Sequence, residues 1–114
     1  MNAPAPLPFE VDVVTVKKML DQGERFILID VREADEYATA RIEGSLHIPM
    51  RTIPSQLPDL EPQRDQRVIV HCHHGGRSAR VTQWLRDQGF EKVQNMAGGI
   101  DAWSQQIDPA VPRY

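Results

Sequence analysis

Short apolar runs alternate with amphipathic stretches along most of the chain. The runs at 26–29 and 68–70 contain no polar residue, a pattern typical of strands covered on both faces. A third short strand is predicted at 92–95. Buried strands separated by helices predict an α/β fold with a parallel sheet flanked by helices. The predicted helices lie between Asp12 and Gly23 and at 33–39, 53–60, 78–88 and 100–106.

The length of 114 residues is usual for one domain. Residues 1–8 alternate small residues with proline and predict an extended, loosely held arm. The prolines of 108–114 exclude a helix from the tail, so the folded domain is expected at 9–107. The arm has neither the basic start nor the apolar run of a secretory signal, and we therefore expect a cytoplasmic protein.

Charge and composition narrow the range of partners. Thirteen basic and sixteen acidic residues give a net charge of −3 and a pI near 5.7, which disfavours nucleic acid as a partner. No apolar run is long enough to span a membrane. The single cysteine excludes an intramolecular disulfide and a site built from several thiolates. Cys72 is thus either a buried small hydrophobe or a reactive thiol.

The segment Cys72-His-His-Gly-Gly-Arg-Ser78 joins a predicted strand to a predicted helix. Gly75 and Gly76 permit a tight turn whose N–H groups face inward, and the helix directs the positive end of its dipole to the same place. Such a loop binds anions and lowers the pKa of a cysteine. Arg77 and the two histidines would add positive charge. The alternative is a buried, inert cysteine beside a turn.

The pattern Cys-X-X-Gly-X-Arg-Ser resembles the active loop of the rhodanese-like sulfurtransferases. Three further segments resemble motifs of this family and occur in the same order along the chain. Together the matches extend from about Asp30 to Trp103. The resembling segments are Asp30-Val-Arg-Glu33 with Glu36-Tyr37, Ile42-Glu-Gly-Ser45 with Ile48-Pro49, and Gly98-Gly-Ile-Asp-Ala-Trp103.

The resemblance implies a five-stranded parallel sheet with helices on both faces. The chain departs from the family pattern at Ala40-Arg41, where Gly-His is frequent, and at His47, where Asn is frequent. Both departures lie away from the nucleophile. Four residues separate Cys72 from Arg77, whereas Cys-dependent phosphatases have five. The shorter loop suits a terminal sulfur better than a phosphate or an arsenate.

The resemblance also implies a mechanism. Thiolate Cys72 would attack the outer sulfur of thiosulfate or another sulfane-sulfur donor, and keep it as a persulfide. Cyanide, a small thiol or a protein thiol would then accept the sulfur, and no cofactor is needed. Arg77 would either steer the donor or brace the loop. The expected substrate-binding residues are His73, His74, Gly75, Gly76, Arg77 and Ser78.

Several other residues have both a functional and a structural interpretation. A metal site formed by His71, His73 and His74 is disfavoured, because adjacent residues of a strand point to opposite faces. Asp30 and Arg32 are expected to form a structural pair. Trp84 and Trp103 are expected in the core, and Met50 and Met96 either at the pocket entrance or as gap fillers. A phosphatase or arsenate reductase and a non-catalytic binding module are the alternative functions.

Overall fold

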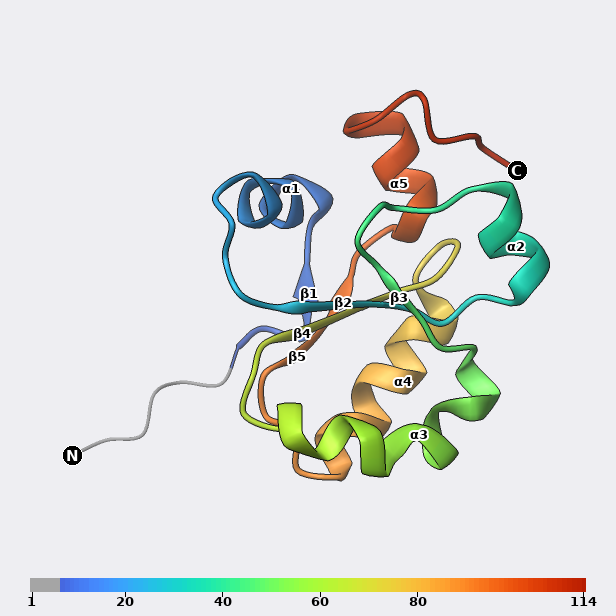
Figure 1. Cartoon of the computed structure of the whole chain (residues 1–114). Helices are drawn as coiled ribbons and strands as arrows, with labels where there is room; N and C mark the ends of the chain where they lie inside the picture. The colour runs from blue at the N-terminus through green and yellow to red at the C-terminus, as the bar shows by residue number, and fades with distance from the viewer. Residues whose placement is uncertain (1–6) are drawn as a thin grey trace.

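A computed structural model describes residues 7–114 and shows one sheet between two layers of helices (Figure 1). All neighbouring strands are parallel, in the order β1-β5-β4-β2-β3. This confirms the predicted α/β fold with a five-stranded parallel sheet. The strands are β1 (Glu10–Val11), β2 (Ile27–Asp30), β3 (Leu46–His47), β4 (Val68–His71) and β5 (Val93–Met96).

The helices cover both faces of the sheet, with α1, α2 and α5 on one side and α3 and α4 on the other (Figure 1). Helix α1 begins after Asp12, whose carboxylate accepts a hydrogen bond from the Thr15 N–H at 2.7 Å and so caps the helix. The helices are α1 (Val13–Asp21), α2 (Ala34–Thr39), α3 (Ile53–Leu60), α4 (Gly76–Asp87) and α5 (Gly99–Gln106), with 3-10 turns at Met50–Thr52 and Glu61–Gln63.

Two apolar cores lie on the two faces of the sheet. The core under α1 and α5 contains Met96, which is completely buried and fills space in the interior rather than at a pocket entrance. Trp103 belongs to the same core, as predicted. Trp84 is half-buried and packs against the second core, which lies under α3 and α4. Burial on both faces explains the continuous apolar runs in β2 and β4.

The two edge strands have no counterpart among the sequence predictions. Strands β1 and β3 contain two residues each, too few to show any hydrophobic period. Helix α4 begins at Gly76, two residues before the predicted start at Ser78. None of the helices in the described part of the chain has the length and apolar character needed to cross a bilayer.

Both predicted end segments contact the domain where the structure describes them. Residues 1–6, most of the predicted arm, lie outside the described residues. The carbonyls of Leu7 and Pro8 accept hydrogen bonds from Arg86, at 3.0 and 3.2 Å. The tail is not helical, as expected, yet Val111 is buried and its carbonyl accepts a hydrogen bond from Ser104. The tail therefore packs against α5.

Candidate active site

Cys72 directly follows β4 and is only 2% exposed. Its Sγ receives hydrogen bonds from the N–H groups of Gly75, at 3.1 Å, and Ser78, at 3.4 Å. The Ser78 hydroxyl lies 3.3 Å from the same sulfur. The predicted inward-facing loop is thus present, and it places donors around a buried thiol.

The turn of the loop depends on one of its two glycines. Gly75 has a φ of +116°, a conformation that L side chains rarely adopt. A Cβ on Gly76 would meet no atom within 4 Å, and Gly76 is already part of α4. The left-handed backbone conformation of Gly75 therefore makes the turn that precedes α4, and the N–H of Gly75 points at the sulfur.

Two opposing effects act on the pKa of Cys72. Burial raises the pKa, but the hydrogen bonds from Ser78 and Gly75 and the charge of Arg77 outweigh burial and lower the pKa below its ordinary value. The beginning of α4 adds the positive end of a helix dipole. The loop therefore favours the thiolate, the form of cysteine that acts as a nucleophile.

Arg77 forms a bidentate ion pair with Glu36 of α2, with N···O distances of 2.6 and 3.0 Å. This hydrogen bonding lowers the pKa of Glu36 to about 2 and raises that of Arg77. Of the two roles considered for Arg77, the bracing role matches these contacts. The sequence places Glu36 within a motif, but nothing local indicates its partner 41 residues away.

Tyr114 is a residue of this site that the sequence did not reveal. Its hydroxyl accepts a hydrogen bond from Arg32 and donates one to Glu36, both at 2.8 Å. Its ring stacks on His73 with centroids 4.0 Å apart. Burial, followed by the proximity of Glu36, raises the pKa of Tyr114 to about 12, so the phenol stays protonated. The tail thereby connects α2 to the loop.

The beginning of α5 holds the loop from the other side. The N–H of Ile100 donates to the Cys72 carbonyl at 2.9 Å, and the N–H of Asp101 donates to the His73 carbonyl at 3.1 Å. A Cβ on Gly99 would lie 2.6 Å from the Cys72 carbonyl oxygen. Glycine at this position therefore allows the helix to approach, which gives a physical reason for the motif that begins at Gly98.

Comparison with known proteins agrees with this geometry. The family model described as "Rhodanese-like domain" matches residues 12–106. The chain belongs to the rhodanese-like family.

Individual relatives of this family differ greatly in length. A sulfurtransferase from Allochromatium vinosum is 33% identical over 102 residues, which cover 90% of this chain and 94% of the relative. Adenylyltransferase and sulfurtransferase MOCS3-2 from Zea mays is 37% identical over 103 residues. That match covers 86% of this chain, but the chain spans only 21% of the maize protein.

A solved structure shows the same fold. The thiosulfate sulfurtransferase from Pseudomonas aeruginosa superposes with a TM-score of 0.76 at 29% sequence identity. The superposition covers 84% of this chain and 18% of that protein. The rhodanese-like fold is therefore present here as a compact unit that also occurs within larger proteins.

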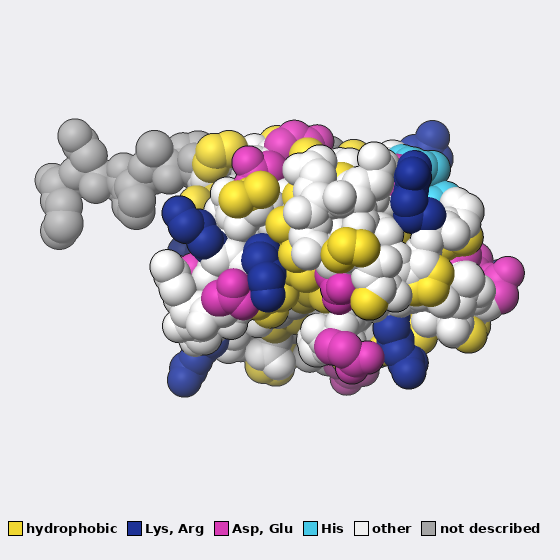
Figure 2. Space-filling model, turned by 90° about the horizontal axis from the view of Figure 1, so that it is seen from above, with side chains coloured by type: hydrophobic (Ala, Val, Ile, Leu, Met, Phe, Trp, Pro, Cys, Tyr) yellow, Lys and Arg dark blue, Asp and Glu magenta, His cyan; other side chains and the backbone are white. Residues whose placement is uncertain are grey.

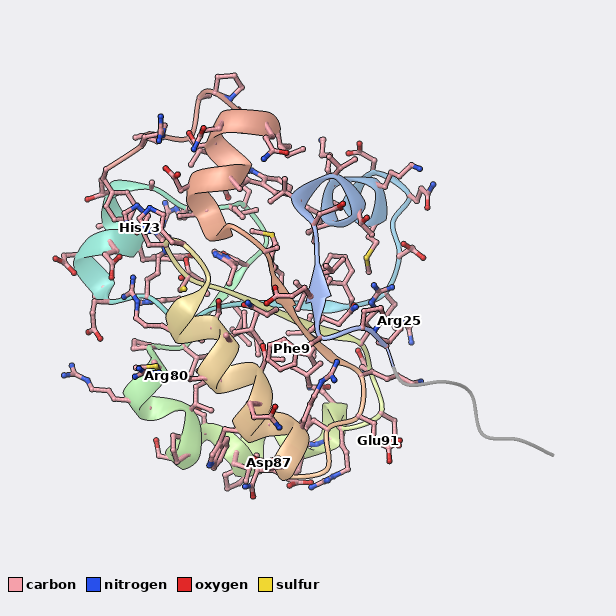
Figure 3. The ribbon with its side chains drawn as sticks, turned by 180° about the vertical axis from the view of Figure 1, so that it is seen from behind. Phe9, Arg25, His73, Arg80, Asp87 and Glu91 are labelled. Atoms are coloured by element: carbon pink, nitrogen blue, oxygen red, sulfur yellow. The ribbon has the colours of Figure 1, made fainter. Side chains whose placement is uncertain are left out.

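His73 and His74 lie in the loop of this rhodanese-like domain and stack on each other, with centroids 3.9 Å apart. Figure 3 shows His73 beside α2 and α5. His73 and His74 each have a ring nitrogen, and Asp101 a carboxylate oxygen, that all lie within 4.8 Å of one another. The prediction that adjacent histidines diverge is wrong for His73 and His74, because they lie in a loop and not in a strand. The two imidazole planes are inclined by 28°, and the Asp101 carboxylate accepts a hydrogen bond from Arg113 at 3.0 Å.

The predicted pair of Asp30 and Arg32 is structural and completely buried. Each N–H of the Arg32 guanidinium has an acceptor: Asp30, Tyr114, and the carbonyls of Glu36 and Ala40. His71 lies behind the pair, and burial lowers the pKa of His71 to about 4, so its ring is neutral near pH 7. These groups support the loop from the interior of the sheet.

The two departures from the family pattern occupy this supporting layer. The Ala40 carbonyl accepts from Arg32, a contact that any residue can provide. The Nε2 atom of His47 lies 2.7 Å from the Arg32 carbonyl, and its ring stacks on Tyr37. Neither residue contacts Cys72 in the hydrogen-bond network described above.

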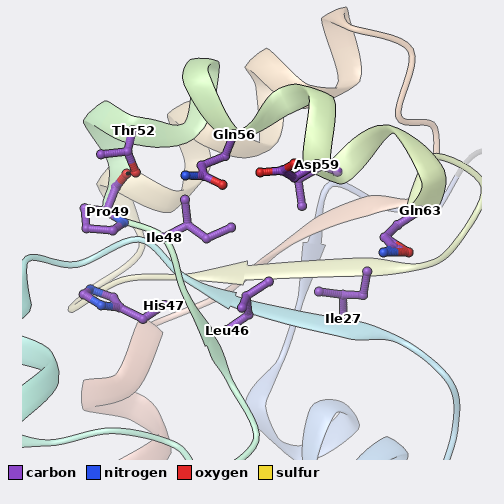
Figure 4. A pocket seen from close by; sticks show the side chains of 10 residues that line it. Ile27, Leu46, His47, Ile48, Pro49, Thr52, Gln56, Asp59 and Gln63 are labelled. Atoms are coloured by element: carbon purple, nitrogen blue, oxygen red, sulfur yellow. Dashed lines mark hydrogen bonds between the residues drawn. The ribbon is translucent and has the colours of Figure 1, made fainter.

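A cavity in the described part of the chain lies away from Cys72. It has a volume of about 650 Å³ and opens between β3 and α3 (Figure 4). A smaller cavity of about 220 Å³ lies between α3 and α4, and Met50 lines it, while Cys72 lines neither cavity. Figure 2 shows basic, acidic and apolar side chains interspersed on the face that carries the histidines. Cys72 itself is only 2% exposed, so its sulfur offers little surface to a reactant.

Proposed function

We propose that this protein is a sulfurtransferase that carries sulfane sulfur on Cys72, from thiosulfate or another sulfane-sulfur donor to cyanide, a small thiol or a protein thiol. The observation that carries the proposal is the set of N–H donors around the buried Cys72 sulfur. The family supports the general chemistry, since relatives bear the name sulfurtransferase. The Pseudomonas aeruginosa protein supports thiosulfate as a donor to test.

The reaction divides into two displacements at sulfur. The Cys72 thiolate attacks the outer sulfur of thiosulfate, the sulfur–sulfur bond of thiosulfate breaks, and sulfite leaves with the electron pair. A cyanide ion or an acceptor thiolate then attacks the terminal sulfur of the persulfide, and the Cys72 thiolate leaves. Atoms and charge balance without an added oxidant, reductant or cofactor.

The loop stabilises charge in each of these states. The N–H groups of Gly75 and Ser78 are fixed before the reaction begins, so they stabilise an anionic sulfur without reorganising. Arg77 contributes positive charge while bound to Glu36. His73 and His74 form the outer part of the loop, and Gly76 starts the helix. We assign substrate binding to this whole segment, with Arg77 acting through its field.

The acceptor must come from outside the described chain, because no second cysteine is present in the sequence. The persulfide cannot be resolved as an internal disulfide. We therefore propose an external thiol or cyanide as acceptor, and a reducing compartment such as the cytoplasm, in which the Cys72 thiol stays available.

The test is intact mass spectrometry before and after incubation with thiosulfate, using wild type and Cys72→Ser. We expect the wild type to gain one sulfur atom, to lose it on addition of cyanide or a thiol, and Cys72→Ser to gain none. Absence of the added sulfur in wild type with every donor tried, or its presence in Cys72→Ser, would refute the proposal. An aryl-phosphate assay run in parallel tests the phosphatase alternative, for which no turnover is expected.

A further inference from the structure

Asn95 lies on β5 and connects the Cys72 loop to β1. The side chain is almost completely buried, and its Nδ2 donates to the Gly75 carbonyl at 3.2 Å and to the Glu10 carboxylate at 3.0 and 3.2 Å. These two acceptors fix the orientation of the amide, because the amide oxygen in the same place would face other oxygens. The amide oxygen Oδ1 must therefore face the loop, where it lies 2.5 Å from the Ser78 hydroxyl.

The Ser78 hydroxyl has one hydrogen and several acceptors within reach. Asn95 Oδ1 lies at 2.5 Å, whereas the Cys72 sulfur and the Gly75 carbonyl oxygen both lie at 3.3 Å. Since an amide oxygen can only accept, the short contact requires Ser78 to donate to Asn95. While the hydrogen is donated to Asn95, the sulfur receives hydrogen bonds from backbone N–H groups alone. The hydroxyl contact at 3.3 Å, which helps to lower the pKa of Cys72, forms when Asn95 gives the hydrogen up.

We propose that Asn95, oriented by Glu10, is a positioning residue that competes with the Cys72 sulfur for the Ser78 hydroxyl hydrogen and so restrains the reactivity of the thiol. With the thiol protonated, the hydrogen stays on the side of Asn95. With the sulfur negatively charged, rotation of one hydroxyl brings a further donor to it. The inference extends the proposed sulfur chemistry, but it concerns the thiol itself and is testable without a sulfur donor.

Several charged or titratable groups surround this network and contribute to the state of Cys72. Arg77 lies at the start of α4 and is paired with Glu36 of α2, and Glu10 extends from β1. The remaining groups are His71 with Asp30 and Arg32 behind the loop, and His73, His74 and Asp101 on its outer side. Substitutions at Asn95 remove none of these charged groups. A change in the pKa of Cys72 can therefore be assigned to the loss of the Asn95 amide.

Two substitutions of Asn95 are predicted to act in opposite directions. Asn95→Leu keeps the branched shape of the side chain but has no acceptor, so it frees the Ser78 hydrogen for the sulfur and lowers the pKa of Cys72. Asn95→Asp puts a carboxyl group beside the Glu10 carboxylate. In the pH range where both are ionised, it supplies a stronger acceptor and an added negative charge, and so raises that pKa. Below the pKa, we expect the rate of alkylation by iodoacetamide to rise roughly tenfold in Asn95→Leu and to fall roughly tenfold in Asn95→Asp.

The readouts are the pH dependence of alkylation and of the ultraviolet absorbance of the thiolate. Both report one group, because Cys72 is the only cysteine. The absorbance does not depend on access to the buried sulfur. In a Ser78→Ala background the hydroxyl is gone, so Asn95→Leu should no longer change the rate. Shifts of both Asn95 variants in the same direction, or an equal effect of Asn95→Leu with and without Ser78, would overturn the proposal.

A second pair of variants tests the same proposal from an exposed position, where folding is not at risk. Glu10→Ala removes the acceptor that orients the amide, and alkylation should rise about threefold. Glu10→Gln keeps an acceptor oxygen and should match the wild type. Equal rates for these two variants would contradict the role of Glu10. Sulfur loading, measured separately, tests the proposed function, so failure of one can be told from failure of the other.

Discussion

Replacing Glu36 by glutamine should remove a pH-dependent part of the stability. Glu36 accepts two hydrogen bonds from Arg77 and one from Tyr114, and its side chain is 17% exposed. Hydrogen bonding to Arg77 lowers its pKa from the ordinary value of 4.5 to about 2. At 1.36 kcal/mol per pKa unit this difference corresponds to about 3 kcal/mol. Solvent screening at the partly exposed pair reduces the expected effect to about 1–2 kcal/mol.

The sign of the pH dependence follows from the direction of the shift. Because the folded state has the lower pKa, the ionised carboxylate stabilises the fold fully above pH 4.5 and progressively less as the pH falls toward 2. Glu36→Gln cannot ionise, so its deficit relative to wild type should be largest near pH 7 and should disappear near pH 2. The amide can still accept one hydrogen bond from Arg77, which limits other losses.

Urea unfolding at a series of pH values between 2.5 and 7 measures this difference directly. Asp35→Asn is the matched control, since Asp35 lies in the same first turn of α2, is exposed, and forms no ion pair among the described residues. Its deficit should be small at every pH. A Glu36→Gln deficit that is constant with pH, or absent at pH 7, would show that the ion pair does not stabilise the loop as inferred.

Three further predictions concern other contacts of the site. Tyr114→Phe keeps the stacked ring but leaves a buried donor of Arg32 without a partner, so it should cost about 1–2 kcal/mol in urea unfolding, and no loss would show that the phenol contact is unimportant. Gly75→Ala should abolish most sulfur loading in intact mass measurements, because of its positive φ, while Gly76→Ala stays close to wild type; equal loading of the two would contradict the assigned turn. His71 has a folded pKa of about 4 against 6.5 ordinarily, so wild type should lose up to about 3 kcal/mol as the pH falls from 6.5 to 4, and His71→Leu should lack this loss in the same titration; parallel titrations would refute it.

The parts of the fold that could be predicted from sequence are those with a local signal. The apolar runs of β2 and β4 are buried on both faces, so they stand out against their polar surroundings. The loop after Cys72 combines glycine, a helix start and a nucleophile within seven residues, and the structure contains the turn and the inward donors at that place. Each of these signals lies within a short window of the chain.

The missing parts of the site depend on contacts between distant segments. Tyr114 lies 78 residues from Glu36, and Asn95 lies 85 residues from Glu10. No spacing rule relates such positions, because the sheet order decides which strands become neighbours. The pairing of β1 with β5 brings Glu10 to Asn95, and these two-residue and four-residue strands carry too little pattern to reveal that pairing.

The support of Cys72 by distant segments has a consequence for newly made protein. Gly99 at the start of α5 and Tyr114, whose segments hold the Cys72 loop in place, follow Cys72 in the sequence, so they leave the ribosome later than the thiol. Until they dock, Cys72 is an ordinary cysteine with a pKa of about 8.5, mostly protonated at pH 7 and slow as a nucleophile. We therefore expect the pKa of Cys72 to fall only when these later segments hold the loop in place. If the proposed function holds, we expect a nascent chain to react slowly with sulfur donors until these segments have docked.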